Sequence, residues 1–108
     1  MMNAISKIAI AGVLTAASMA GHASEALAGK YACVACHQAA QRIVGPSWNE
    51  IAEKHGKAGT TPAQLAASIK KGGSGIWGAM PMPPQTTLSD TDATALATWI
   101  LQRRPATK

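Results

Sequence analysis

The sequence predicts an all-α fold of about four helices, and two observations along the chain predict it. In four segments apolar residues recur at helical spacing behind a residue that caps helix N-termini, and no segment shows the alternation typical of a strand. Residues 72–88, rich in glycine and proline, separate the last two helices. A loop of that length in a chain of 108 residues is usually functional.

The two N-terminal helices are predicted from their caps. Ser24 can cap the first helix, which we expect to run to about Cys33. Ser47 and Glu50 form a capping box for the second helix, and Gly56 should end it. One face of the second helix is expected to carry Trp48, Ile51, Ala52 and His55.

The two C-terminal helices carry equally clear start and stop signals. Thr61 precedes Pro62, a residue favoured at the first helical position, and Gly72 should end this third helix. Ser89 opens the fourth helix, which should end before Pro105. The apolar face of the fourth helix follows the 3.6-residue period closely, with Ala93, Leu96, Ala97, Ile100 and Leu101.

The N-terminal segment is built like a secretory signal peptide. Residues 1–7 carry one positive charge, residues 8–20 form an uncharged apolar run, and small residues at Gly21 and Ala23 suit a cleavage site. We therefore expect a signal peptide over residues 1–23 and one domain over residues 24–108.

Two alternatives to a signal peptide are an uncleaved N-terminal anchor and a mitochondrial transit peptide. The apolar run of 13 residues is shorter than the roughly 20 that span a membrane. The segment also contains no arginine, in which transit peptides are rich. We expect export, with no stable membrane insertion after cleavage.

The charge of the chain is modestly basic. Its formal net charge is +5, and removing Lys7 with the signal peptide lowers it to +4. No basic residues alternate with aromatic residues as stacking on bases would require, so we expect no nucleic-acid partner. A small positive surplus fits docking onto acidic protein surfaces.

The domain is also short of large apolar side chains. It has no phenylalanine, and much of its apolar content is alanine, which buries little area. A domain of this size usually needs a disulfide, a metal or a similar aid to stability. A further component is therefore expected to fill the core.

The segment Cys33-Val34-Ala35-Cys36-His37 is a C-x-x-C-H motif, the attachment site for c-type haem. Two thiols two residues apart can each add to a vinyl group on one edge of the porphyrin. The histidine directly after the second cysteine then reaches the iron from one face. The motif predicts one haem c bound covalently through Cys33 and Cys36, with His37 as an iron ligand.

Besides a chance match to the motif, the cysteine pair has two other interpretations. A disulfide or thioredoxin-like redox pair would use C-x-x-C, but such pairs follow a strand in a βαβ pattern that this sequence lacks. A zinc site would need four ligands, and His55 is the only further histidine after residue 23 besides His37. Both are weaker than haem attachment.

The long loop offers two methionines as the second axial ligand. A thioether closes the iron to other ligands and raises its reduction potential. Met82 lies in Pro81-Met82-Pro83-Pro84, where fixed φ angles hold an extended segment. We expect Met82 to be the ligand, with Met80 as the competitor that otherwise packs at the haem edge.

With these motifs the chain resembles the short bacterial class I cytochromes c, soluble periplasmic carriers that serve nitrite reductases and terminal oxidases. The resemblance covers nearly all of the domain and rests most heavily on the string Trp-Gly-x-x-Pro-Met-Pro-Pro. The segments that carry it are residues 33–37, 44–46, 75–78, 81–84 and 96–101.

The resemblance implies a class I cytochrome c fold, about four helices wrapped around one haem, and a role for each matching residue. His37 and Met82 would be the axial ligands of the iron. The carbonyl of Pro46 would accept the Nδ1–H of His37, and the indole N–H of Trp77 would reach a haem propionate, unless Trp77 only packs in the core. Trp99 would be buried where the first and last helices cross.

Two positions depart from the family pattern. Gln85 stands where such proteins often have an asparagine whose amide bonds the ligand sulfur. Ser68 replaces an arginine of the third helix that commonly holds a propionate. Both departures affect the expected reduction potential rather than the haem assignment.

The resemblance implies a monomeric periplasmic protein that shuttles one electron between a donor and an acceptor, and not an enzyme. The alternatives are a haem subunit of a larger reductase or oxidase complex and a thiol–disulfide oxidoreductase. A ring of cations for docking onto acidic partners, or merely a solvated face, is formed by Lys54, Lys57, Lys70, Lys71, Arg103 and Arg104.

Overall fold

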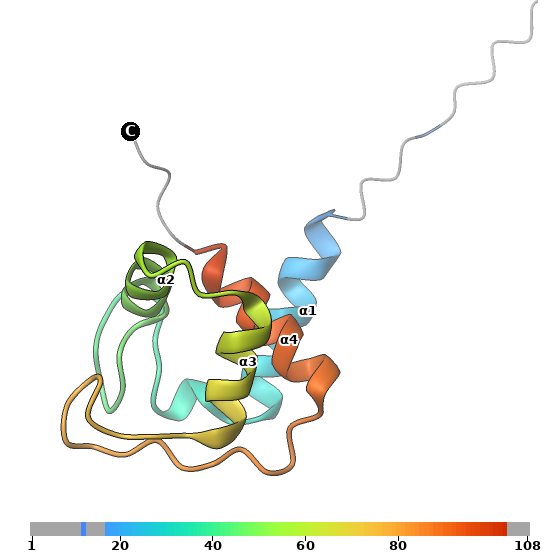
Figure 1. Cartoon of the computed structure of the whole chain (residues 1–108). Helices are drawn as coiled ribbons and strands as arrows, with labels where there is room; N and C mark the ends of the chain where they lie inside the picture. Colours follow the sequence, from blue (N-terminus) through green and yellow to red (C-terminus); the bar gives the residue numbers. More distant parts are fainter. Residues whose placement is uncertain (1–11, 13–16, 104–108) are drawn as a thin grey trace, which may run out of the picture.

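The computed structural model describes residue 12 and residues 17–103, and the side chains from residue 24 onward. Most of the predicted signal peptide, together with Arg104 and Pro105, lies outside the described residues. Four α-helices and one turn of 3₁₀-helix form in the described part, and no strand does (Figure 1). They are α1 (Ala17–Lys30), η1 (Cys33–Ala35), α2 (Trp48–Lys57), α3 (Pro62–Lys71) and α4 (Asp90–Leu101).

The first helix differs from the sequence-based expectation at both ends. It begins at Ala17 rather than after Ser24, because the alanine-rich sequence before Ser24 lets the helix continue through it. The Ser24 hydroxyl therefore caps nothing and donates instead to the carbonyl of Ala95 on α4 at 3.4 Å. The helix ends at Lys30, three residues before the predicted Cys33.

The early end of α1 has a local cause. Ala32 adopts a left-handed conformation with φ of 59°, which a helix cannot continue. A residue with a Cβ atom in this conformation costs roughly 1–2 kcal/mol. The strained residue turns the chain into η1, which begins at Cys33 and is followed directly by Cys36.

The other predicted helix starts are confirmed. Ser47 and Thr61 each form a complete capping box, and the Ser89 hydroxyl accepts the N–H of Asp92 at 3.1 Å. Helix α2 continues one residue beyond the predicted stop at Gly56. Gly72, with φ of 68°, ends α3 as expected.

Helix α4 is the central element and contacts each of the other three helices. Its apolar face packs over α1, α2 and α3, and Leu96 is its largest fully buried side chain. Trp99 is only partly buried, with its ring edge-on to Trp48 at 5.5 Å. The core consists of Ala28, Trp48, Ile51, Leu65, Ala66, Leu88, Ala93, Leu96, Ala97 and Ile100.

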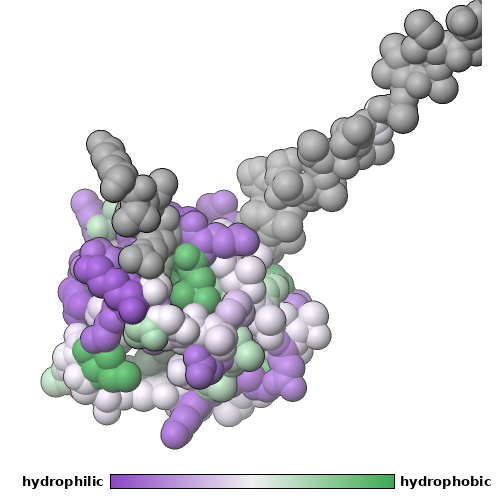
Figure 2. Space-filling model, turned by 45° about the horizontal axis from the view of Figure 1, so that its top comes forward, coloured by the Kyte–Doolittle hydropathy of each residue, from purple (hydrophilic) through white to green (hydrophobic). Residues whose placement is uncertain are grey.

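The surface shown in Figure 2 alternates hydrophilic residues with separate hydrophobic groups. In the described part of the chain, no helix combines the length and apolar character needed to cross a membrane. Among the side chains that the structure describes, five large apolar ones are nevertheless well exposed: Val34, Ile43, Val44, Ile76 and Met80.

Candidate functional site

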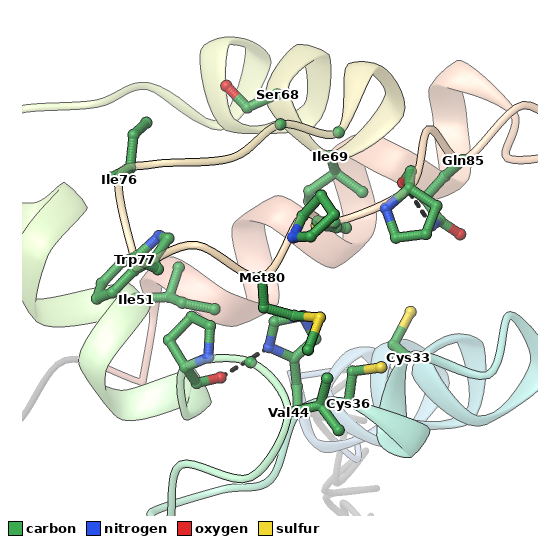
Figure 3. A pocket seen from close by; sticks show the side chains of 18 of the residues that line it. Cys33, Cys36, Val44, Ile51, Ser68, Ile69, Ile76, Trp77, Met80 and Gln85 are labelled. Carbon is green, nitrogen blue, oxygen red and sulfur yellow. Dashed lines mark hydrogen bonds between the residues drawn. The ribbon is translucent and has the colours of Figure 1, made fainter.

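A cavity of about 280 Å³ lies between the helices and the two long loops, and its lining is mostly apolar (Figure 3). The predicted site residues meet there: both cysteines, His37, Pro46, Trp77, Met80 and Met82 all contribute to its wall. A mostly apolar pocket with a few convergent polar groups is what a large planar cofactor requires. The residues present therefore fit a haem.

Both cysteines lie side by side at one end of this cavity, with their sulfur atoms turned toward it (Figure 3). Both thiols are free and partly buried. Burial raises the pKa of the Cys33 thiol; a backbone hydrogen bond lowers it by less, and the nearby Cys36 adds the smallest contribution, a further rise. Redox-active C-x-x-C pairs have a lowered thiol pKa, so this environment disfavours a thiol–disulfide oxidoreductase.

His37 is held in one orientation by two contacts. Its Nδ1 lies 2.7 Å from the carbonyl oxygen of Pro46, and its ring stacks on Trp48 at 4.8 Å between centroids. A carbonyl can only accept, so Nδ1 carries the proton and donates it there. The other ring nitrogen, Nε2, is then left with its lone pair for a metal. The side chain is only 8% exposed.

The loop around His37 is tightly built. The N–H of Gly45 donates to the carbonyl of Cys36 at 2.8 Å, and the N–H of Trp48 donates to that of Gln38 at 2.9 Å. A Cβ atom on Gly45 would lie 2.7 Å from Cε1 of His37. Only glycine allows the backbone to approach the imidazole this closely.

The methionine loop is fastened near Met82. The N–H of Met82 donates to the carbonyl of Gly73 at 2.7 Å, and the N–H of Gly73 donates to the carbonyl of Met82 at 3.0 Å. The N–H of Gln85 donates to the carbonyl of Lys70 at 2.9 Å. Met82 is half-buried, whereas Met80 is 67% exposed although it also lines the cavity (Figure 3).

The two positions that depart from the family pattern both use their side chains locally. The Gln85 amide donates to the carbonyl of Pro83 at 2.9 Å, and the Ser68 hydroxyl donates to the carbonyl of Gln64 at 3.2 Å. Ser68 is exposed at the cavity wall. Neither residue brings a charge to the site.

Trp77 is partly buried at the end of the cavity opposite the cysteines (Figure 3). Two cationic side chains lie over its ring. The guanidinium of Arg42 lies 5.8 Å and the ammonium of Lys54 4.8 Å from the ring centroid. Arg42 also donates to the Trp77 carbonyl at 2.8 Å and lies 3.5 Å from a carboxylate oxygen of Glu50.

Sequence reasoning placed His55 on the buried face of the second helix but gave it no role at the site. The structure brings it to the cavity wall, with Nδ1 3.0 Å from the hydroxyl oxygen of Thr60. Burial lowers the pKa of His55, and the charge of Lys54 lowers it further. Its helical spacing from Trp48 and Ile51 was the signal that could have identified it.

Comparison with known proteins gives a consistent result. Residues 19–100 match the family described as "Cytochrome C oxidase, cbb3-type, subunit III". Cytochrome c-552 of Nitrosomonas europaea is 49% identical over 75 residues, which cover 69% of this chain and 73% of that protein. Cytochrome c-552 of Hydrogenobacter thermophilus is 46% identical over 79 residues, covering 73% of this chain and 80% of that one.

A solved structure agrees with these relatives. The crystal structure of wild-type Nitrosomonas europaea cytochrome c552 matches with a TM-score of 0.71 and 46% identity, over 74% of this chain and 99% of that one. The predicted all-α fold around one haem is therefore confirmed. The chain belongs to the class I cytochromes c, and it is a small monohaem electron carrier, not an enzyme, that binds haem c covalently through Cys33 and Cys36.

Proposed function

We propose that this chain carries one electron at a time through a haem iron held between His37 and Met82. The observation that carries this proposal is the orientation of His37 beside the cysteine pair. With Nδ1 bound to Pro46, its free nitrogen is available to the iron of a haem fixed by the adjacent thioethers. A second protein ligand leaves no open position, so the iron exchanges electrons rather than substrates.

Met82 is the better of the two methionines for the second position. Both its backbone N–H and its carbonyl pair with Gly73, and Pro81 and Pro83 on either side restrict the chain further. Its sulfur is therefore presented to the iron with little conformational entropy to lose. Met80 has no such backbone pair, has a proline on one side only, and is mostly exposed, which suits a residue at the rim of the haem edge.

The partners are redox proteins that bind over the cavity mouth. Exposed apolar residues at the cavity wall would allow close approach to the haem edge, namely Val44, Ile76 and Met80. Two of the predicted docking cations are engaged within the chain, since Lys57 pairs with Glu53 and Lys70 with Asp90. The remaining basic residues favour partners with acidic docking surfaces.

The site of action is the bacterial periplasm. The proposal rests on the signal-like build of residues 1–23, with cleavage giving a monomeric domain over residues 24–108. A free carrier is favoured over a subunit of a larger complex, because the relatives of this chain are small monohaem cytochromes c-551 and c-552 that act as electron carriers.

The test compares Met82→Ala with Met80→Ala in holoprotein whose mass includes one haem. Met82→Ala should abolish the sulfur-to-iron absorption of the oxidised protein and allow cyanide or carbon monoxide to bind. It should also shift the reduction equilibrium toward the oxidised form by at least about tenfold, or 59 mV for one electron. Met80→Ala should retain the absorption. The opposite result would make Met80 the ligand, and a mass without haem would refute the proposal altogether.

A further inference from the structure

The two ends of the cavity face different edges of the cofactor. Haem c forms its thioethers on one edge of the macrocycle, and the opposite edge carries two propionate carboxylates. Cys33 and Cys36 lie at one end of the cavity, whereas Trp77 and Ile51 lie at the other (Figure 3). The carboxylate edge of a haem attached to the cysteines would therefore be directed toward Trp77 and the adjoining part of α2.

The cavity wall itself offers these carboxylates no countercharge. Among the described residues that line it, none is a lysine, arginine, aspartate or glutamate. A carboxylate in a partly apolar site is costly unless it is paired or hydrogen-bonded. Beyond a hydrogen bond such as that expected from the Trp77 indole, any countercharge within the described part of the chain comes from side chains just behind the wall.

Two cations stand at this position, both against Trp77. Arg42 is already occupied, since it bonds the Trp77 carbonyl and lies 3.5 Å from Glu50. Lys54 lies 4.8 Å from the centre of the Trp77 ring and, within the described part of the chain, has no carboxylate within ion-pair distance. Lys57, one turn further along α2, is by contrast paired with Glu53 at 3.0 Å.

We propose that Lys54, held against Trp77 beside Arg42, supplies the positive charge that offsets the haem propionates and thereby raises the reduction potential. The inference rests on the proposed function, because it concerns the same haem. Reduction adds one electron and takes Fe(III) to Fe(II), so nearby carboxylates favour the oxidised form. A cation close to them opposes that preference.

A second observation concerns how close Lys54 lies to the cavity. The charge of Lys54 contributes to the lowered pKa of His55, whose ring forms part of the cavity wall. Lys54 is therefore the direct neighbour of a residue of the cavity wall. Lys54 acts as a positioning and electrostatic residue and does not bind the iron.

The test is voltammetry of the holoprotein without any partner, at low and high ionic strength. Lys54→Gln should shift the reduction equilibrium about threefold toward the oxidised form at low ionic strength, and less in high salt. The reduction equilibrium of Lys54→Arg should remain within about 1.3-fold of that of the unsubstituted protein, because arginine keeps the charge. The matched control is Lys57→Gln, which removes the same charge from the same helix and should shift the equilibrium less than half as much as Lys54→Gln.

Two results would overturn the inference: no shift in Lys54→Gln, or an equal shift in Lys57→Gln, which would indicate net charge alone. Both failures are distinguishable from failure of the proposed function. If the sulfur-to-iron absorption is intact in every variant, the axial ligation stands while the role of Lys54 falls. If the absorption is missing from the unsubstituted protein, the ligation itself is wrong.

Discussion

The two loops that line the haem cavity are fixed to the rest of the molecule to different degrees. The His-side loop, residues 33–47, holds a buried imidazole between a carbonyl and a tryptophan ring, and several backbone hydrogen bonds tie it to itself and to α2. The Met-side loop, residues 72–88, is closed on itself by the Gly73–Met82 pair. One bond from Gln85 joins it to α3, and the hydrogen bond from Arg42 to the Trp77 carbonyl joins it to the His-side loop. Much of its surface, including Met80, is exposed.

This difference separates what the polypeptide builds from what the cofactor completes. The His side already has the orientation that an axial ligand needs, so iron binding there costs little ordering. In the proposed ligation, the Met side gains a further anchor only when the Met82 sulfur bonds the iron. The least stable parts of a structure open first, and here that part is the Met-side loop.

The largest effect is expected when the cofactor is withheld from both loops. A Cys33→Ala/Cys36→Ala protein made without haem should lack a cooperative thermal transition, because its core contains few large side chains and the porphyrin supplies the missing apolar surface. The helices would lose their shared packing face, and isolated helices of this length are marginal in water. Far-UV circular dichroism during heating is the measurement. A sharp native-like transition would mean that the polypeptide has a sufficient core of its own.

Adding one methyl group to each loop should separate the two sides. Gly45→Ala places Cβ against the His37 ring and should lower the free energy of unfolding by about 1–3 kcal/mol. Gly72→Ala adds Cβ against the Met82 carbonyl at a residue with positive φ. It should weaken the sulfur-to-iron absorption more than Gly45→Ala does.

The control for this pair is Gly29→Ala in α1. A Cβ atom there meets nothing within 4 Å, and alanine favours a helix over glycine by about 0.5–1 kcal/mol. Denaturant unfolding and the visible spectrum are recorded for all three variants. If the sulfur-to-iron absorption is as strong in Gly72→Ala as in Gly45→Ala, the Met-side loop is not the more sensitive of the two loops.

A smaller effect is expected from His55 in the cavity wall behind both loops. Its pKa in the folded protein lies below the ordinary value of 6.5, so the unfolded chain binds the proton more readily. Its contribution to stability is fully present above pH 6.5 and is lost as pH falls through the lowered pKa. Between pH 8 and pH 5 the unsubstituted protein should therefore lose more stability than His55→Gln, measured by denaturant unfolding. Equal losses would show that the pKa of His55 is the same in the folded and the unfolded protein.

Most of the fold could be predicted because its signals are local. The caps at Ser47, Thr61 and Ser89 and the stop at Gly72 depend on neighbouring residues alone, and the structure confirms all four. The first helix was predicted less well. Its start depends on a stretch with few helix-breaking residues, and its end depends on Ala32 in a conformation that sequence patterns do not reveal for alanine.

The same distinction applies to the site. The cysteine pair and His37 form one short motif, and their joint presence at the cavity could be read from spacing alone. The cations on Trp77 could not, because Arg42 and Lys54 come from a loop and a helix that only the tertiary fold brings together. His55 was placed on the correct helical face, but the cavity that it lines is likewise a product of tertiary packing.

The most direct test of the central claim is a guanidinium titration of the oxidised holoprotein, followed by two signals on the same samples. The sulfur-to-iron absorption reports the Met-side loop, and far-UV circular dichroism reports the helices. We expect the absorption to be lost at a clearly lower guanidinium concentration than the helical signal, because the Met-side loop has the fewest anchors. Coincident midpoints for the two signals would contradict the account, since they would mean that both loops are equally part of one cooperative unit.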